Sequence, residues 1–245
     1  MTGAKTAPRH VDVINTRLNA VRLLQTVKQV MGMSYRALSR QTGLSVTVLS
    51  RYYTGYVLPG PDTATRLIQV LTKKYPATRL LVEEYPRNPG AFCDPLLLEL
   101  LAADCINRLR GKRVNYVVAC DSYGLPFATI LSQRIVNCKV LHARGTPPPR
   151  PLLQNYRAVT YMVGEHPATL WMPRHVKKNH AFYAVAGVVA GENLLARSRA
   201  TIEYLKSKRL EHVGSTVVVA DGVDIGEVED AFGENVNIIL KVNGA

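Results

Sequence analysis

The sequence predicts an α + α/β protein, in which a helical N-terminal region precedes a domain with a mainly parallel β-sheet. Apolar residues from Ile14 to Met31 recur every three or four positions, the spacing of one helix face. From Asp94 onward, short apolar β-rich runs alternate with helical segments, an order typical of a parallel sheet covered by helices. We therefore predict a helical domain at residues 1–75, a Pro-rich linker at 76–93 and an α/β domain at 94–245.

The helical region contains further start and stop signals. Two short helices are expected after the first one, and Pro59-Gly60-Pro61 then interrupts any helix. Asp62 is the predicted N-cap of the next helix, which carries Leu67 and Leu71 on its apolar face.

The α/β region begins with Asp94-Pro95, an N-cap followed by a proline at the first position of a helix that runs to about Leu109. The other predicted helices span residues 125–136 and 193–207. Apolar runs predict strands at 114–119, 139–142, 181–189, 216–220 and 237–242, and a hairpin from 159–163 and 169–172.

Composition narrows the class of protein. Of the 245 residues, 47% are hydrophobic and 20% are charged, as in an ordinary globular chain. No run approaches the roughly 20 apolar residues of a membrane helix, and the N-terminus lacks a secretory apolar segment, so a cytoplasmic location is expected. The four cysteines lack zinc-ligand spacing, which favours buried reduced thiols and no metal. A disulfide remains possible if the source is a hyperthermophile.

The positive charge is concentrated near the N-terminus. Through Tyr75 there are eleven Lys or Arg residues and two acids, a net charge of +9, whereas the rest holds 20 basic and 16 acidic residues, a net +4. A basic segment of this kind indicates a polyanionic partner such as DNA. A solvated charged face is the alternative.

The segment from Ser34 to Gly55 has the pattern of two helices joined by a sharp turn. Ser34 and Ser45 are suited to cap the two helices, and Gly43 is suited to the turn between them. With Leu38 and Leu49 facing inward, the outer face of the second helix suits the major groove of DNA. The predicted DNA contacts are Tyr35, Arg36, Val46, Thr47, Ser50, Arg51 and Thr54.

This segment resembles the helix-turn-helix of phage-repressor type, over roughly residues 14 to 75. Tyr53 stands where that family usually has a glutamate. A protein-docking helical hairpin is the alternative interpretation.

The order of elements after Asp94 resembles the type I phosphoribosyltransferase fold, through a strand, the loop Cys120-Asp-Ser-Tyr-Gly-Leu-Pro126, a helix and a strand ending in His142-Ala-Arg144. The two parts together resemble archaeal orotate-phosphoribosyltransferase-like transcriptional regulators. The resemblance implies a nucleotide or phosphoribosyl ligand at the carboxyl edge of the sheet. The ligand-binding residues that it implies are Asp121, Ser122, Tyr123, Gly124, Arg144, Val188, Val189, Ala190, Gly191, Asn193 and Asp221.

The resemblance fails at the acidic pair of the phosphoribosyl diphosphate motif, where Ala186 and Gly187 stand. Those acids would position the substrate and its metal, so the sequence predicts no enzyme, no catalytic residue, no metal and no cofactor. Glu192 is unfavourable beside a phosphate unless its side chain turns outward.

The leading hypothesis is a homodimeric DNA-binding regulator that senses a nucleotide or phosphoribosyl ligand. An active nucleobase phosphoribosyltransferase with an accessory helical domain is one alternative, and a dimeric DNA-binding scaffold without a ligand is another. Arg174, Lys177 and Lys178 form a basic patch that is interpreted mainly as a solvated loop, although it would also suit DNA or a ligand phosphate.

Overall fold

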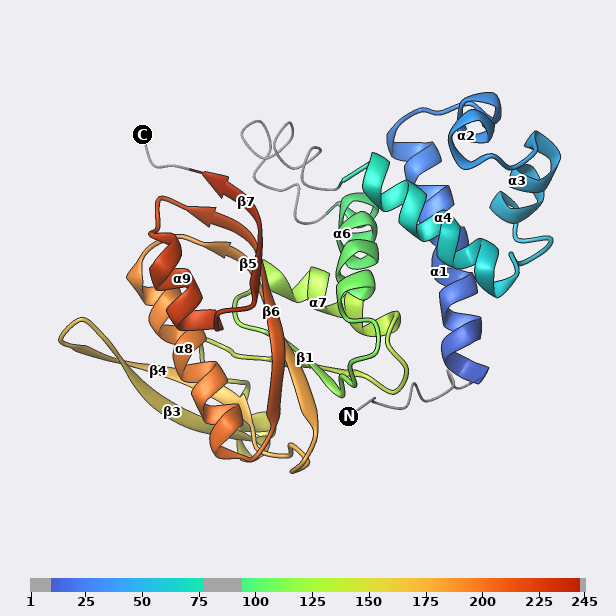
Figure 1. Cartoon of the computed structure of the whole chain (residues 1–245). Helices are drawn as coiled ribbons and strands as arrows, with labels where there is room; N and C mark the ends of the chain where they lie inside the picture. Colours follow the sequence, from blue (N-terminus) through green and yellow to red (C-terminus); the bar gives the residue numbers. More distant parts are fainter. Residues whose placement is uncertain (1–9, 77–93, 243–245) are drawn as a thin grey trace, which may run out of the picture.

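The computed structural model describes residues 10–76 and 94–242, and it arranges them as a group of helices packed beside an α/β sheet (Figure 1). Helix α6 lies between the N-terminal helices and the sheet. The predicted linker at 76–93 lies outside the described residues, except for its first position. The elements before it are α1(His10–Val30), α2(Tyr35–Thr42), α3(Val46–Tyr53) and α4(Pro61–Lys74).

Helices α2 and α3 begin where the sequence predicts. The hydroxyl oxygen of Ser34 accepts from the Ala37 amide at 3.2 Å, and that of Ser45 accepts from the Val48 amide at 3.3 Å. Gly43 ends α2 with φ +72°, a left-handed backbone that a glycine adopts without strain. The short connection therefore follows from residues local to it.

Helix α4 begins earlier than predicted. Gly60 is its N-cap and Pro61 occupies its first turn, so Asp62 lies inside the helix and not at the cap. A proline is favoured at this position because its missing amide would have no partner in the helix, and its fixed φ already suits the helix. Asp62 still places negative charge at the positive end of the helix.

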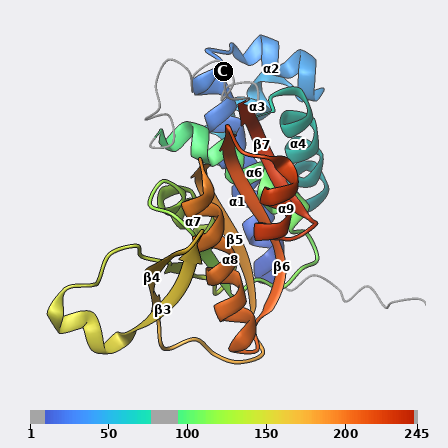
Figure 2. The ribbon, with the colours of Figure 1, turned by 90° about the vertical axis from the view of Figure 1, so that its left-hand side faces the viewer.

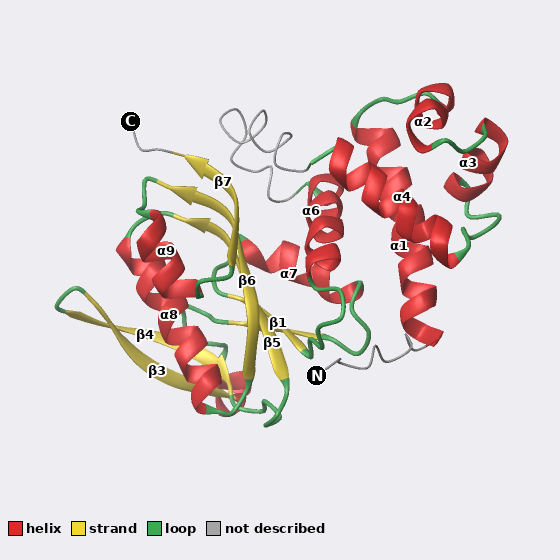
Figure 3. Ribbon diagram, in the orientation of Figure 1, coloured by secondary structure: helices red, strands yellow, loops and turns green. Residues whose placement is uncertain are grey.

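The α/β part has a five-stranded parallel sheet in the order β2-β1-β5-β6-β7. Figure 3 labels β1, β5, β6 and β7 of this sheet and shows them in yellow. The fold class predicted for this part, a parallel-sheet α/β domain after a helical region, is confirmed. Its helices and strands are α6(Pro95–Arg108), β1(Tyr116–Ala119), α7(Gly124–Gln133), β2(Lys139–His142), β5(Ala181–Val189), α8(Glu192–Ser207), β6(Glu211–Asp221), α9(Ile225–Phe232) and β7(Val236–Val242).

The two faces of the sheet are covered by different helices. Alternate strand residues such as Val117 and Val185 pack with α6 and α7, while Val118 and Ala184 face α8 and α9. Strand β5 is buried along nearly its whole length because it lies in the middle of the sheet and both of its faces are covered. Its continuous apolar run is therefore the expected sequence of a central parallel strand.

The predicted hairpin forms and is longer than expected. Strands β3(Tyr156–Val163) and β4(His166–Pro173) pair antiparallel, preceded by the 3-10 helix η2(Arg150–Asn155). Figure 2 shows this segment projecting from the body of the molecule. Leu170 and Met172 of β4 are fully buried against the α8 side of the sheet, which anchors the hairpin.

Helix α9 was not predicted. Asp224 caps it, since its carboxylate accepts from the amides of Gly226 and Glu227 at 2.8 and 3.3 Å. The cap signal was present in the sequence, but a helix of eight residues gives only two turns of periodicity.

One hydrophobic cluster joins the helical region to the sheet. Leu24 of α1, Leu71 of α4, Leu101 of α6 and Val117 of β1 all belong to it.

An ion pair between Arg134, at the end of α7, and Glu99 of α6 lies near this contact, and the Arg134 side chain is fully buried. Burial lowers the pKa of Arg134 to about 10, with a smaller effect from Arg22 of α1. The proposed domain boundary near residue 75 stays a prediction.

Within the described ranges, no helix is long and apolar enough to cross a membrane.

Cys105, Cys120 and Cys138 are free thiols, and Cys93 lies outside the described residues. Burial raises the pKa of Cys105 to about 11 and that of Cys120 to about 12, so both are protonated thiols near neutral pH.

Replacing Leu101 by Ala should lower the free energy of unfolding by about 2–5 kcal/mol, because it opens a cavity in the shared core. We expect the helical region and the sheet to unfold in one transition that shifts as a whole, measured by urea denaturation with circular dichroism and tryptophan fluorescence. Leu18→Ala, at a leucine that is 39% exposed, is the control and should have a much smaller effect. Two separate transitions, of which only one shifts, would contradict a shared core.

Candidate functional site

The candidate site lies at the carboxyl edge of the sheet, between β1 and β5. The chain leaves β1 toward β2 on one side and leaves β5 toward β6 on the other. In open α/β sheets, ligands bind where neighbouring strands lead to opposite sides in this way. The loop at 120–123 and the loop at 190–191 therefore flank the position where a ligand is expected.

Asp121 links these two strands. Its carboxylate accepts hydrogen bonds from the amides of Gly124, Gly187 and Val188, at 2.7, 2.9 and 3.0 Å. The residue is only 3% exposed. Burial raises the pKa of Asp121, although the three amides and the charge of Arg197 act in the opposite direction. The amide of Gly124, one of the predicted ligand-binding residues, thus already has an acceptor within the protein.

The loop after β1 lies directly against the backbone of β5. A Cβ atom added at Gly187 would stand 2.6 Å from the Gly124 nitrogen, and one added at Gly124 would stand 2.9 Å from the Gly187 nitrogen. Ala186, the preceding residue, is 1% exposed. Position 187 therefore has no room for a side chain, and the carboxylate found next to it comes from Asp121 on the neighbouring loop.

Basic side chains gather on the other side of this edge. His142 ends β2, and the backbone of Arg144 pairs with that of Trp171 through hydrogen bonds of 3.1 and 2.8 Å. Burial lowers the pKa of His142, and the charges of Arg144 and Arg197 lower it further. His142 is therefore neutral near pH 7 and lies within electrostatic reach of both guanidinium groups.

Arg197 was missed by the sequence analysis. It projects from α8, and its Nη1 lies 2.8 Å from the point that a Cβ would occupy at Gly145, beside Arg144. In the part of the chain that the structure describes, the buried Nε atoms of Arg144 and Arg197 have no hydrogen-bond acceptor. Such donors are costly to leave unpaired, and an anion would satisfy them. The one available signal was its position four residues after Asn193, on the same helix face.

The residues after β5 hold the hairpin. The Glu192 carboxylate turns outward and accepts from the Gly164 amide at 2.8 Å, and the Tyr161 hydroxyl donates to Asn193 at 3.0 Å. Gly191 adopts φ +80° between the strand and α8. The outward direction of Glu192 removes the predicted conflict with a phosphate at the helix start.

The remaining predicted ligand residues differ in what they can offer. Ser122, Tyr123 and Ala190 are exposed at the edge, while Asp221 is half-buried at the end of β6. Val189 is fully buried, so only its backbone can reach a ligand. A ligand-binding role for this set stays a prediction.

The predicted DNA contacts lie together on α2 and α3. Arg36, Val46, Thr47 and Arg51 are exposed, whereas Ser50 is half-buried. The Arg51 guanidinium lies 5.2 Å from the ring centre of Tyr56, which is 76% exposed.

Two predicted contacts are engaged within the helices themselves. Tyr35 is half-buried and packs edge to face on Tyr53, with ring centres 5.8 Å apart. The Thr54 hydroxyl donates to the carbonyls of Ser50 and Arg51 at 3.0 and 3.2 Å. Arg40, exposed in the last turn of α2, was not predicted and adds positive charge to this surface.

Over residues 10–76 and 94–242, no three His, Cys, Asp or Glu side chains are grouped as metal ligands. No family model matches the sequence, and no curated protein matches it.

Solved structures do share its fold. Adenine phosphoribosyltransferase from Leishmania donovani is 11% identical with a TM-score of 0.52, and the match covers 70% of this chain and 80% of that one. The enzyme of the same name from Rhodothermus marinus is 15% identical with a TM-score of 0.46, covering 60% and 81%. The chain therefore has a phosphoribosyltransferase-like α/β fold with a helical N-terminal region, and the fold part of the predicted resemblance is confirmed.

The prediction that the chain is not an enzyme is contradicted, because the Leishmania donovani protein whose fold it shares is an adenine phosphoribosyltransferase. The prediction relied on the missing side chains at Ala186 and Gly187. The residues along β5 do not show a carboxylate that comes from another segment. Asp121, from the loop after β1, places its carboxylate against β5. The residues at 186 and 187 therefore do not by themselves support the conclusion that the chain is not an enzyme.

Replacing Gly187 by Ala should destabilise the protein by about 1–3 kcal/mol or more, because the new Cβ overlaps the loop at Tyr123 and Gly124. Urea denaturation measures the change. The control is Gly60→Ala, where a Cβ would meet no atom within 4 Å and φ is −60°, so only the smaller cost of an alanine at the N-cap of α4 is expected. An equal change in both variants would mean that the loop does not lie against β5.

Proposed function

We propose that this protein is a DNA-binding transcriptional regulator whose phosphoribosyltransferase-like domain binds a nucleotide or phosphoribosyl ligand. The observation that carries the proposal is the exposed basic face of α2 and α3. There, Arg36, Arg40 and Arg51 face solvent while Leu38 and Leu49 are fully buried.

The second helix of this pair has the composition of a DNA-recognition helix. An α-helix fits the major groove, where an arginine can donate two hydrogen bonds to guanine and small apolar groups contact the thymine methyl. Arg51 and Thr47 supply polar contacts, and Val46, 41% exposed, supplies an apolar one. Exposed apolar and basic residues side by side on one short helix suit base recognition better than they suit a solvated face.

Backbone contacts would come from the first helix. Arg36 and Arg40 are exposed on α2 and would neutralise phosphates on either side of the groove. Repressors of this type bind as dimers on roughly palindromic sites, so we include a homodimer in the proposal.

The ligand part of the proposal is supported by the carboxyl edge of the sheet. Arg144 and Arg197 converge there with unsatisfied Nε donors, beside a neutral His142. A phosphate or pyrophosphate group would accept from both guanidinium groups. We favour these guanidinium groups over the loop amides as phosphate donors because the Gly124 amide is already bonded to Asp121.

Helix α7 is the suggested connection between the two parts. It begins at Gly124 beside the ligand edge and is followed by Arg134, which forms the ion pair with Glu99 of α6. Helix α6 in turn packs on α1 and α4. A ligand that favours one position of α7 would change DNA affinity only through its different affinity for the two arrangements.

Phosphoribosyl transfer is the second candidate function. The fold shared with the Leishmania donovani enzyme favours it. Incubation with phosphoribosyl diphosphate, magnesium and each nucleobase distinguishes the two functions by the presence or absence of nucleotide product.

Replacing Arg51 by Ala should weaken binding to a duplex selected from a random library by about 1–3 kcal/mol and relax the preference at one base pair. Arg36→Ala should weaken binding to all duplexes and reduce the salt dependence by about one ion. Fluorescence anisotropy at several salt concentrations measures both effects. The control is the double variant Arg110→Ala, Arg113→Ala, at exposed residues of the α/β part. DNA affinity that is indifferent to Arg36 and Arg51 would refute this interface.

Replacing both Arg144 and Arg197 by Ala should reduce the affinity for phosphoribosyl diphosphate or a purine nucleotide by about ten-fold or more, because two charge-assisted hydrogen-bond donors are lost. Calorimetric titration measures this, with the Arg110→Ala, Arg113→Ala double variant as the control of equal charge. Unchanged affinity would place the ligand elsewhere. If no phosphate ligand binds the unaltered protein, the scaffold interpretation replaces this part of the proposal.

A further inference from the structure

A basic depression lies at the end of the α/β part opposite to the carboxyl edge, between the base of the hairpin and the end of α8. We call it the basal groove. Its volume is about 460 Å³. Its lining residues are Arg157, Arg174, Tyr204 and Lys208.

Three separate segments bring these cations around one aromatic ring. Arg157 projects from β3, where it pairs with Met172, and Arg174 follows β4. The Arg174 Nε donates to the Tyr156 carbonyl at 2.7 Å, which fixes the direction of that side chain. The Lys208 Nζ lies 5.4 Å from the centre of the Tyr204 ring. Tyr204 is 8% exposed, so it forms the floor of the groove.

Among the described residues, the positive charge in the basal groove has no acidic partner. No acidic residue lines it, and in the described parts of the chain no ion pair involves Arg157, Arg174 or Lys208. The adjoining groove along α8 contains one acid, Glu203, together with Arg199. Three like charges held around one depression repel each other, and a bound anion would relieve that repulsion.

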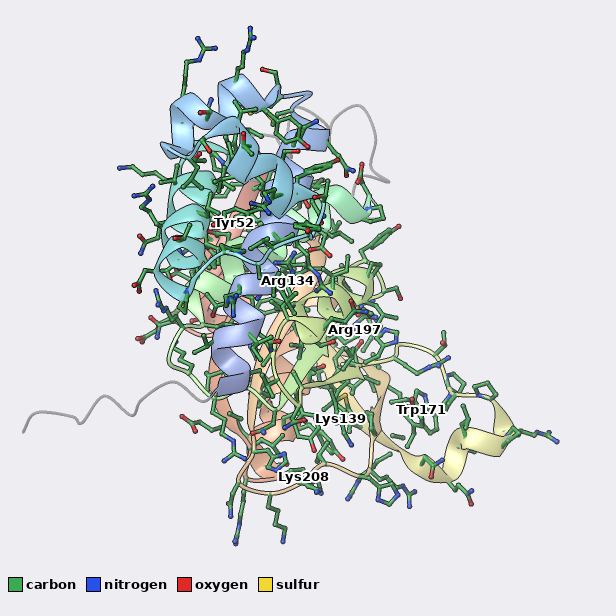
Figure 4. The ribbon with its side chains drawn as sticks, turned by 90° about the vertical axis from the view of Figure 1, so that its right-hand side faces the viewer. Tyr52, Arg134, Lys139, Trp171, Arg197 and Lys208 are labelled. Carbon is green, nitrogen blue, oxygen red and sulfur yellow. The ribbon has the colours of Figure 1, made fainter. Side chains whose placement is uncertain are left out.

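The basal groove is separate from the carboxyl edge of the sheet. Arg197 and Lys208 both belong to α8 or its C-cap, eleven residues apart, which corresponds to about 16 Å along a helix. Figure 4 shows these two labelled side chains well apart on the molecule. Arg174 and Lys208 precede β5 and β6, so the groove lies at the amino end of the strands.

We infer that the basal groove is a binding site for phosphate groups. Guanidinium groups match phosphate oxygens with paired hydrogen bonds, and a lysine adds a flexible point charge. The volume suits a compact polyphosphate, and the cationic walls favour such an anion over an apolar ligand. The phosphates belong either to DNA that follows the protein surface or to a free polyphosphorylated nucleotide, and the chemistry of recognition is the same.

The test removes two of the three cations, in the double variant Arg157→Ala, Lys208→Ala. Arg174 is left in place because it also holds the hairpin. The probe is inorganic tripolyphosphate in calorimetry at low salt, with every protein carrying Arg144→Ala and Arg197→Ala so that the carboxyl edge does not contribute. We expect binding at one equivalent, weakened about ten-fold or more by the groove substitutions.

The matched control is Arg110→Ala, Arg113→Ala in the same background, which removes equal charge from an exposed loop. Thermal melting by circular dichroism checks that each variant is folded. If the groove variant does not fold, Arg157→Gln with Lys208→Gln replaces it. Absence of binding before the groove substitutions, or an equal loss in control and groove variants, would overturn the inference.

A second measurement distinguishes the source of the phosphates. If they belong to DNA, the groove variant in an otherwise unaltered chain should lose about two ions from the salt dependence of duplex binding. If DNA binding is unchanged while tripolyphosphate binding is lost, the natural ligand is a free polyphosphate. Either result supports a phosphate site, and the DNA-recognition face of α3 is tested separately by Arg51→Ala.

Discussion

The contact between the loop after β1 and the backbone of β5 organises the α/β part of this protein. Gly187 and Gly124 allow the two backbones to approach, and the Asp121 carboxylate joins them through three amides. This contact sets the start of α7, next to the point where the connections from β1 and β5 lead to opposite sides of the sheet. The amides cannot be left unpaired in a buried site, so the carboxylate that satisfies them is as much a structural requirement as the glycines.

The same contact shapes the electrostatics of the sheet edge. One buried carboxylate lies on the β1 side, while Arg144 and Arg197 approach from β2 and α8 with donors that the described residues do not satisfy. Their charges, added to burial, lower the pKa of His142. The edge thus presents separate acceptor and donor groups, an arrangement that suits a phosphate held away from Asp121.

The helical region and the sheet are physically connected. Helix α6 packs on α1 and α4 on one side and on α7 on the other, and the buried Arg134 forms its ion pair with Glu99 at this junction. Removing one partner of a buried pair leaves an uncompensated charge, so α6 and α7 resist moving independently. The continuous core through Leu24 of α1, Leu101 of α6 and Val117 of β1 likewise holds the helical region against the sheet.

The sequence alone determined the features that depend on neighbouring residues. The caps at Ser34, Ser45 and Asp94, the turn at Gly43 and the apolar run of β5 are local signals. The parallel-sheet class and the order of the α-helices and strands other than α9 followed from such signals. The predicted N-cap at Asp62 was wrong because Pro61 is favoured at the first position of the helix, which moves the N-cap to Gly60.

Tertiary structure decided what converges from distant segments. Three features depend on which strands are neighbours. They are the direction of the Asp121 carboxylate, the approach of Arg197 to the sheet edge and the grouping of cations around Tyr204. Strand order brings residues more than sixty positions apart, such as Asp121 and Gly187, into hydrogen-bonding distance. Periodicity and capping extend over only a few residues, so they contain no information about such pairs.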